Sequence, residues 1–322
     1  MYPLKFKKTL VKKIWGGRKF DTILNMDLPD ENLYGESWEV SSHKGGLSYI
    51  ENGEYSGKAL IELIEEKKSE ILGEEIIERF QGQFPLLIKY LDINDRLSVQ
   101  VHPSDEYALK VEGEFGKSEC WYVMEASDDA TLILGIKDGI TREIFKEKVD
   151  KKEFDGLFNT VKVKKGDFIN LLPGVVHATS EGSILICEVQ QNSDTTYRIY
   201  DFDRLVDGKL RELHIDKALE VIDFEKQVQI TTSESRQKIS LVGAQKEELV
   251  RGQYFNVDKY LIDGKFEDET NNNFKILSII DGKGEIICDE KSYEISKGDT
   301  YFIPAKLKTT ITGKVEVLKS YL

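Results

Sequence analysis

The chain reads Lys165-Gly166-Asp167-Phe168-Ile169-Asn170-Leu171-Leu172-Pro173 near its middle, and Lys297-Gly298-Asp299-Thr300-Tyr301-Phe302-Ile303-Pro304 near its C-terminus. Each copy combines a Gly-Asp turn, a short apolar run and a proline, which is typical of a β-strand bounded by turns. A glycine turn is expected at residues 280–285, between two further apolar runs that precede the second copy. The repeat predicts two small β-barrels of one type, so we expect a mainly β fold with a few inserted α-helices.

More strand-like runs surround both copies. They lie at residues 86–91, 96–102, 118–124, 130–134, 161–163, 183–190, 255–262, 274–280, 285–288, 301–303 and 315–320. Helical spacing of apolar residues predicts helices at residues 59–66, after a capping Thr141, and at 215–224. We therefore expect a first domain over residues 1–224, which contains the helical insertions, and a second β domain over residues 225–322.

Composition excludes several classes of protein. The 322 residues include 40% apolar residues and carry a formal charge of −13, which argues against a nucleic-acid-binding protein. No apolar run is long enough for a membrane helix, and the lysine-rich start is not followed by the apolar stretch of a secretory signal. The cysteines, Cys120, Cys187 and Cys288, are too widely spaced for a disulfide framework. We expect a cytoplasmic protein.

A set of metal-ligand types falls on predicted strands and turns. Gln100 and His102 lie at positions i and i+2 of one strand, so both side chains point to the same face. Glu119 begins another strand, and His177 follows the Pro173-Gly174 turn. An amide oxygen, a carboxylate and two imidazoles suit a zinc ion that keeps one position open.

Simpler interpretations compete with the metal site. A single histidine in a β protein is usually structural, Gln-x-His alone is a weak pattern, and Glu119 alone could be a solvated strand residue. The combination of all four ligand types is far more specific. His43 lies in a predicted loop and His214 opens a predicted helix, so structural roles are favoured for both. Cys120 points to the strand face opposite Glu119 and is expected to pack.

Several segments together resemble a known family. These are Trp15-Gly16-Gly17, Gly35-Glu36-Ser37-Trp38-Glu39-Val40-Ser41, Phe84-Pro85-Leu86-Leu87-Ile88-Lys89, Leu97-Ser98-Val99-Gln100-Val101-His102-Pro103, Gly116-Lys117-Ser118-Glu119-Cys120-Trp121-Tyr122, Pro173-Gly174-Val175-Val176-His177-Ala178 and Glu188-Val189-Gln190-Gln191-Asn192-Ser193-Asp194-Thr195-Thr196-Tyr197-Arg198. In this order they resemble the type I, zinc-dependent mannose-6-phosphate isomerases of the short bacterial form, whose barrels are of the cupin type. Gln100 replaces the first histidine of the general cupin His-x-His pattern, as it does in these isomerases.

The resemblance implies one Zn²⁺ per chain. Its ligands would be Gln100, His102, Glu119 and His177, and residues 225–322 would form the family's second, metal-free cupin domain. The resemblance also implies that Arg198 is the active-site arginine and that Lys117 lines the sugar-phosphate pocket. For Lys117 a plain surface position is the alternative, and for Arg198 a solvated strand end. We add Ser98 and Lys89 as substrate-binding candidates.

The implied reaction interconverts D-mannose 6-phosphate and D-fructose 6-phosphate through an enediol-like intermediate, with zinc as Lewis acid. Arg198 stays cationic, so it would stabilise oxyanion charge or hold the phosphate, while Lys117 would hold the phosphate or move a proton. The general base is open between Glu36, Lys117, Glu188 and a zinc-bound water. Burial would raise the pKa of Glu188 toward that of a useful base.

Alternatives remain for the function. A cupin with iron would be an oxygenase, a related enzyme would isomerise another sugar, and a protein without turnover would only bind sugar phosphates. The phosphorylated substrate is a dianion, so we expect Lys89, Lys117 and Arg198 to offset the acidic chain locally. Trp15, Trp38 and Trp121 are expected to pack in the core, although one could line the sugar pocket. A monomer is the default expectation.

Overall fold

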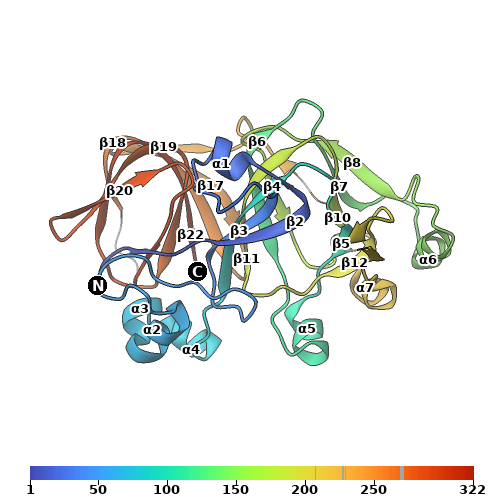
Figure 1. Cartoon of the computed structure of the whole chain (residues 1–322), viewed down its shortest axis with the longest axis horizontal. Helices are drawn as coiled ribbons and strands as arrows, with labels where there is room; N and C mark the ends of the chain where they lie inside the picture. Colours follow the sequence, from blue (N-terminus) through green and yellow to red (C-terminus); the bar gives the residue numbers. More distant parts are fainter. Residues whose placement is uncertain (207, 227, 229, 269–271) are drawn as a thin grey trace.

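The computed structural model describes residues 1–206, 208–226, 228, 230–268 and 272–322. The protein is mainly β, with 45% strand and 15% helix, as predicted. The C-terminal strands form one side of the molecule, residues from the middle of the chain form the other, and short helices lie along the margins (Figure 1).

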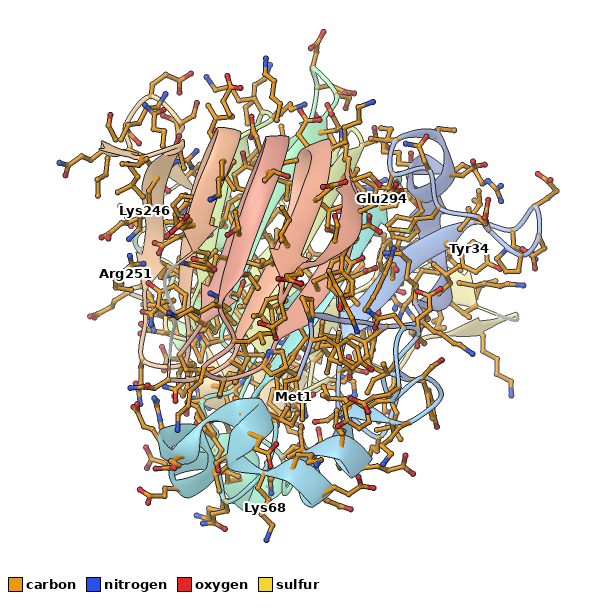
Figure 2. All side chains as sticks on the ribbon, turned by 90° about the vertical axis from the view of Figure 1, so that its left-hand side faces the viewer. Met1, Tyr34, Lys68, Lys246, Arg251 and Glu294 are labelled. Carbon is orange, nitrogen blue, oxygen red and sulfur yellow. The ribbon has the colours of Figure 1, made fainter. Side chains whose placement is uncertain are left out.

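The C-terminal sheet has eight strands in the order β1-β21-β19-β22-β18-β17-β16, with β20 paired to β19. Its strands are β1 (Leu4–Lys5), β16 (Lys238–Leu241), β17 (Ala244–Arg251), β18 (Asn256–Asp268), β19 (Lys275–Cys288), β20 (Lys291–Ser296), β21 (Thr300–Ile303) and β22 (Thr309–Tyr321). Figure 2 faces this sheet, with Lys246 and Arg251 toward one edge and Glu294 toward the other. The first strand of the chain therefore completes a sheet built from its last third.

The prediction of two strands separated by a turn at residues 280–285 was wrong. One strand, β19, covers both runs, because β22 pairs with it from Lys275 to Ile287. The register shifts between Ile279 and Asp281, and Gly282 adopts a positive φ of 79°. A glycine tolerates that bulge without ending the strand.

Two sheets make up most of the rest of the fold. The seven-stranded sheet has the order β15-β9-β6-β11-β4-β3-β2 and the five-stranded sheet the order β12-β5-β10-β7-β8. The first consists of β2 (Thr9–Gly17), β3 (Tyr34–Val40), β4 (Leu86–Ile93), β6 (Glu119–Ala126), β9 (Phe168–Leu171), β11 (Ile184–Gln191) and β15 (Ile230–Thr231). The second consists of β5 (Val99–Val101), β7 (Thr131–Ile136), β8 (Phe158–Lys162), β10 (His177–Glu181) and β12 (Tyr197–Tyr200), and a separate hairpin joins β13 (Leu205–Val206) to β14 (Lys209–Leu210). In the described part of the chain no strand order returns to its first strand, so each sheet is open.

An apolar core joins the seven- and five-stranded sheets. Trp121 and Val123 of β6 pack in one cluster with Leu132 and Leu134 of β7. Cys120, the residue between Glu119 and Trp121, belongs to a different cluster on the opposite face of β6, as the strand alternation predicts. Glu119 shares the face of β6 that carries Trp121 and Val123, so its side chain points between the two sheets.

The helices are short. They are α1 (Lys19–Thr22), α2 (Leu60–Lys67), α3 (Ser69–Leu72), α4 (Glu74–Phe80), α5 (Asp105–Val111), α6 (Arg142–Asp150) and α7 (Ile215–Val221). The predicted helices correspond to α2, α6 and α7, and the Thr141 side chain caps α6 by accepting a hydrogen bond from the Ile144 N–H. Helix α7 ends before residue 224 because Ile222 is extended (φ −62°, ψ 129°). Among the described residues no helix has the length and apolarity needed to cross a bilayer.

The two Lys-Gly-Asp turns make the same backbone contacts. Gly166 N–H donates to Val123 O and Gly298 N–H donates to Ile279 O, each at 2.8 Å. Both glycines have a positive φ, 90° and 92°. The internal repeat read from the sequence is therefore a structural repeat, in which Val123 corresponds to Ile279.

Candidate metal centre and active site

Three metal-ligand side chains meet between the seven- and five-stranded sheets. His102 follows β5, Glu119 begins β6 and His177 begins β10. All three are buried, and their donor atoms lie within 4.8 Å of one another. Strand pairing explains the convergence, because His177 lies directly opposite Gln100 in the sheet. The arrangement agrees with the metal site expected from the sequence.

Both imidazoles are oriented as metal ligands. His102 Nδ1 lies 2.9 Å from Thr195 O, and His177 Nδ1 lies 3.0 Å from Val175 O. A backbone carbonyl can only accept, so each Nδ1 carries the proton and each Nε2 presents a lone pair. The Nε2 atoms face Glu119, at 3.6 Å for His102 and 3.3 Å for His177. Burial and the nearby Lys117 cation lower the pKa of His102 well below its usual value, so it stays neutral and able to bind a cation. Histidines that bind a divalent metal typically donate their other ring N–H to a carbonyl in this way.

Lys117 lies directly against these donors. Its Nζ is 2.9 Å from Glu119 Oε2 and 3.2 Å from His102 Nε2. Only 5% of Lys117 is exposed, so the surface-lysine alternative is excluded. Although burial acts to raise the pKa of Glu119, the Lys117 cation lowers it well below its usual value. Glu119 is therefore an ionised carboxylate, and a divalent cation would share it with Lys117.

Gln100 and Ser98 complete one wall of the centre. Gln100 Nε2 lies 3.4 Å from His177 Nε2, and Gln100 Oε1 accepts a hydrogen bond from Ser98 Oγ at 3.1 Å. The amide nitrogen of Gln100 therefore faces His177. A 180° rotation of the amide group would direct its oxygen toward a metal beside His177 instead. Gln100 thus fits a fourth ligand, and Ser98 contacts it.

A cavity of about 220 Å³ opens beside the metal-ligand group. Its cationic lining residues outnumber the acidic ones five to three: Lys13, Lys89, Lys117, Arg198 and Arg211 against Glu36, Glu188 and Asp194. Trp15 and Trp121 also line it, so two of the three tryptophans contact the cavity. The local balance is positive although the whole chain carries −13, which suits an anionic substrate.

Glu188 is the carboxylate whose pKa is shifted toward neutrality. Burial and the Glu119 charge raise its pKa to about 7. Its Oε2 accepts a hydrogen bond from Trp121 Nε1 at 2.8 Å, and Lys89 Nζ lies 3.9 Å from Oε1. Glu188 therefore has the environment of a general base or acid.

Glu36 has the opposite character. It accepts a hydrogen bond from Trp38 Nε1 at 2.7 Å and pairs with Lys13 Nζ at 2.8 Å. Burial acts to raise its pKa, but the charges of Lys89 and Lys13 lower it to about 2. Such a carboxylate is a poor proton acceptor near neutral pH, so Glu36 does not fit the role of base.

Lys89 lies in the floor of the cavity. Its Nζ is 3.7 Å from Glu36 Oε2 and 3.8 Å from Asp194 Oδ1, and it lies 4.5 Å from the centre of the Trp38 ring. None of the carboxylates is close enough for a normal hydrogen bond. The buried ammonium thus keeps donor capacity for a ligand.

Arg198 is a half-buried cavity residue and not a solvated strand end. It lies on β12 directly opposite Gln100, and its Nη1 donates to Glu212 O at 2.8 Å. Burial and the nearby Arg211 lower its pKa. Arg211 lines the same cavity and donates from Nε to Asp201 Oδ2 at 2.7 Å. Two guanidinium groups therefore line the same cavity.

The sequence interpretation missed Lys13, Asp194 and Arg211. Asp194 lies within a segment that carries the family resemblance, but Lys13 and Arg211 carry no motif. The two histidines assigned structural roles lie elsewhere: His43 Nδ1 accepts from Gly45 N–H, and His214 Nδ1 accepts from Arg198 N–H. Neither belongs to the metal-ligand group.

Comparisons with known proteins agree with the family resemblance seen in the sequence. A model of the type I phosphomannose isomerase catalytic domain matches residues 3–122, and a model of the mannose-6-phosphate isomerase cupin domain matches residues 245–322. Mannose-6-phosphate isomerase from Streptococcus mutans is 38% identical over 99% of this chain and 98% of its own length. The chain belongs to the type I mannose-6-phosphate isomerase family. The family resemblance seen in the sequence is therefore confirmed.

Other members of the family agree. Mannose-6-phosphate isomerase ManA from Bacillus subtilis is 38% identical over 99% of both chains. A crystal structure of the mannose 6-phosphate isomerase from Bacillus subtilis superposes with a TM-score of 0.90 at 34% identity, covering both chains fully. A putative mannosephosphate isomerase from Archaeoglobus fulgidus, 23% identical, shares the fold at a TM-score of 0.78 over 100% of this chain and 98% of its own.

The C-terminal sheet carries different side chains at the positions that correspond to the ligands. Leu171 and Ile303 each lie four residues after the aspartate of a Lys-Gly-Asp turn. Leu171 pairs with Glu119 and Ile303 pairs with Lys275, so Glu119 corresponds to Lys275. His177 and Thr309 also lie at the same distance along the chain from these two aspartates, so they correspond to each other. Gln100 is the strand partner of His177 and Asp268 is that of Thr309, so Gln100 corresponds to Asp268. Lys275 and Asp268 form a buried ion pair. A lysine ammonium therefore takes the position of Glu119, the candidate metal ligand.

Proposed function

We propose that the chain interconverts D-mannose 6-phosphate and D-fructose 6-phosphate, with the cavity beside His102, Glu119 and His177 as the active site. The observation that carries the proposal is the position of this buried ligand group beside a cation-rich cavity, which Lys117 and Gln100 line while they contact Glu119 and His177. Full-length similarity to mannose-6-phosphate isomerases supports the choice of substrate.

Zn²⁺ is the proposed metal, one per chain, held by Gln100, His102, Glu119 and His177. The neutral imidazoles, the carboxylate and an amide oxygen are ligands that zinc accepts. When bound, zinc would supply Lewis-acid polarisation of the sugar oxygens at C1 and C2. The ion pair of Lys275 with Asp268 supports a single site, because it leaves the corresponding position of the second unit occupied by an ammonium.

Glu188 is the proposed proton carrier. Isomerisation moves a proton between C1 and C2, so one group must accept it and return it. A carboxyl with a pKa of about 7 is half ionised near neutral pH and can do both. The Trp121 indole holds Glu188 Oε2 in place, which leaves Oε1 for the substrate.

The cations of the cavity orient and stabilise the sugar phosphate. Arg198 and Arg211 are proposed to bind the phosphate, because a planar guanidinium can donate two hydrogen bonds to phosphate oxygens. Lys117 and Lys89 lie nearer the carboxylates and are proposed to bind the sugar oxygens of the substrate and to stabilise the oxyanion that develops there during enolisation. Ser98 is proposed to contact the substrate from the cavity wall.

The proposed architecture is two cupin-type barrels. Residues 1–224 would form the catalytic barrel and residues 225–322 the second, metal-free barrel. The matching contacts of the two Lys-Gly-Asp turns support this division, and the cupin family model begins at residue 245. A cytoplasmic monomer completes the proposal.

A coupled assay tests the function. Fructose 6-phosphate formed from mannose 6-phosphate is measured on the purified protein, again after treatment with a chelator, and again after zinc is restored. Activity should disappear and return. Absence of turnover by the folded, zinc-loaded protein would overturn the assignment and favour a sugar-phosphate-binding protein. Oxygen-dependent activity restored by iron alone would favour the oxygenase alternative.

A further inference from the structure

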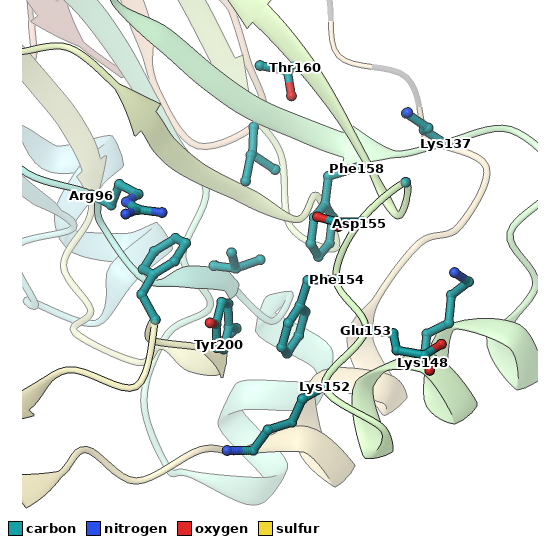
Figure 3. A pocket seen from close by; sticks show the side chains of 14 residues that line it. Arg96, Lys137, Lys148, Lys152, Glu153, Phe154, Asp155, Phe158, Thr160 and Tyr200 are labelled. Carbon is teal, nitrogen blue, oxygen red and sulfur yellow. The ribbon is translucent and has the colours of Figure 1, made fainter.

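A second, larger cavity lies on the other face of the five-stranded sheet. It has a volume of about 770 Å³ and lies between β5, β12 and the segment that joins α6 to β8 (Figure 3). Val99 lines this groove, whereas its neighbours Ser98 and Gln100 line the active-site cavity. Adjacent residues of a strand face opposite sides of the sheet. The groove is therefore separate from the metal centre but shares strands with it.

Aromatic rings form one part of the groove. The rings of Phe154 and Tyr200 stack at 3.8 Å, and the Phe202 ring lies 4.9 Å from that of Tyr200. The guanidinium of Arg96 lies 4.5 Å from the centre of the Phe202 ring. Only Phe158 among the lining aromatic residues is buried. Phe154 and Tyr200 each cover one face of the other, and Arg204 also lies over the Phe202 ring, at 5.4 Å. A planar ligand would therefore stack on the remaining, partly exposed surface of these rings.

Cationic side chains line the same groove. Arg96, Lys137, Lys148 and Lys152 line the groove, together with the carboxylates of Glu153 and Asp155 (Figure 3). Within the described residues Lys137 and Lys148 form no ion pair, whereas Lys152 pairs with Asp203 at 3.0 Å. Arg96 likewise forms no ion pair with any described residue, so three of the four lining cations have no counter-ion there.

We propose that this groove is an effector site that binds a nucleoside di- or triphosphate. The base would stack on the exposed rings, and the phosphates would contact Lys137 and Lys148. An inorganic anion would leave the rings unused, an apolar molecule would leave the lysines unpaired, and a hexose phosphate has no planar ring to stack. The volume lies within the roughly 300–1,000 Å³ of small-molecule sites.

One segment connects the groove to the active site. Asp201 lies between Tyr200 and Phe202, and its carboxylate binds Arg211 Nε at 2.7 Å and Arg204 Nη2 at 2.7 Å. Arg211 lines the active-site cavity. Phe202 has a left-handed backbone with φ 57°, which is uncommon for a bulky residue. A ligand that moves Phe202 would shift Asp201 and thereby Arg211, so occupancy of the groove should change the KM for the sugar phosphate.

Calorimetric titration with ADP tests the binding on the wild-type protein and three variants. Lys148→Glu removes a phosphate contact, and Phe202→Gly removes a ring at a position whose backbone glycine favours. Lys110→Glu makes the same charge change at an exposed position of α5, outside the groove. Saturable binding of ADP should weaken about tenfold or more in the first two variants and stay unchanged in Lys110→Glu. Circular dichroism establishes that each variant is folded.

The controls separate the possible outcomes. Pyrophosphate should bind much more weakly than ADP; equal affinity would show that the rings play no part. Because coupling between two sites is reciprocal, mannose 6-phosphate should change the affinity for ADP only to a limited extent that saturates. Complete, competitive displacement of ADP by mannose 6-phosphate would place the nucleotide in the active site and overturn the proposal, as would the absence of binding at millimolar ADP. Saturating ADP should change the KM for mannose 6-phosphate in the wild type and not in Lys148→Glu. Binding without any kinetic effect would overturn the effector role, and the calorimetry itself does not depend on the isomerase assignment.

Discussion

Trp121 donates its indole N–H to Glu188 Oε2 at 2.8 Å, across neighbouring strands β6 and β11, in which the two residues are paired. The hydrogen bond holds one oxygen of the carboxylate that we propose as the proton carrier. The other oxygen lies on the side of Lys89. The geometry thus orients Glu188, while burial and Glu119 raise its pKa to about 7.

Glu188→Gln should abolish turnover while zinc remains bound. An amide cannot accept the proton, and we expect kcat to fall by about a thousandfold or more. Metal content, measured by atomic absorption, should stay near one zinc per chain. Turnover within a few-fold of the wild type would assign the proton transfer to another group.

The folding stability of the metal-free protein should depend on pH through Glu188. Because the pKa of Glu188 is raised in the folded protein, ionisation is disfavoured by folding, and stability is lost as pH rises from the unfolded pKa of about 4.5 toward 7. In metal-free protein, Glu188→Gln should therefore raise the denaturation midpoint more at pH 8 than at pH 4.5. A bound cation would lower the pKa and reduce this difference. An equal effect at both pH values would contradict the raised pKa.

Metal binding should depend on His177 and not on His43. His177→Asn removes an imidazole whose Nε2 faces Glu119, whereas His43→Asn changes a loop histidine outside the ligand group. We expect loss of stoichiometric zinc and of activity in the first variant, and retention of both in the second. Retention of zinc by His177→Asn would remove His177 from the ligand set.

Lys117→Ala should weaken substrate binding without weakening zinc binding. The ammonium contacts the same carboxylate that would bind the metal, so its removal leaves zinc affinity equal or higher. Loss of a cation from the cavity should raise the KM for mannose 6-phosphate by about tenfold or more. Lys110→Ala, at an exposed site on α5, provides the control. Unchanged kinetics in Lys117→Ala would exclude its role with the substrate.

A buried arginine should stabilise the junction between the halves of the chain. Arg236 Nε donates to Glu247 Oε2 on β17, and Nη2 donates to Gly166 O in the first Lys-Gly-Asp turn, both at 2.8 Å. Arg236→Met leaves Glu247 buried without its partner, which should cost about 3–5 kcal/mol of unfolding free energy. Lys265→Met, which breaks an exposed pair with Glu267, should change it far less. Urea denaturation compares the two, and equal effects would contradict the structural role of Arg236.

Local patterns predicted much of the fold. The strands β4, β6, β7, β9 and β11 and the helices α2 and α6 were recognisable from periodicity, because each has an apolar face with its own spacing. Strands such as β2, β12, β16 and β20 were missed. β16 is wholly exposed and β20 is largely so, which leaves little apolar alternation to read, and β2 is buried only over its last three residues. The interruption predicted within β19 failed because its glycines were read as a turn, whereas pairing with β22 keeps the strand continuous.

The sequence was enough to predict that His102, Glu119 and His177 come together as a candidate metal-binding group. Alternation along one strand places Gln100 and His102 on one face, and the Pro-Gly turn precedes His177, so residue type and short spacing were enough. Other properties of the site depend on the tertiary structure. Lys13 and Arg211 reach the cavity from strands and loops far apart in the chain, and Glu36 and Glu188 have opposite pKa shifts because their buried neighbours differ. Short-range geometry is encoded in neighbouring residues, whereas burial and the distances between charges arise only when distant segments pack together.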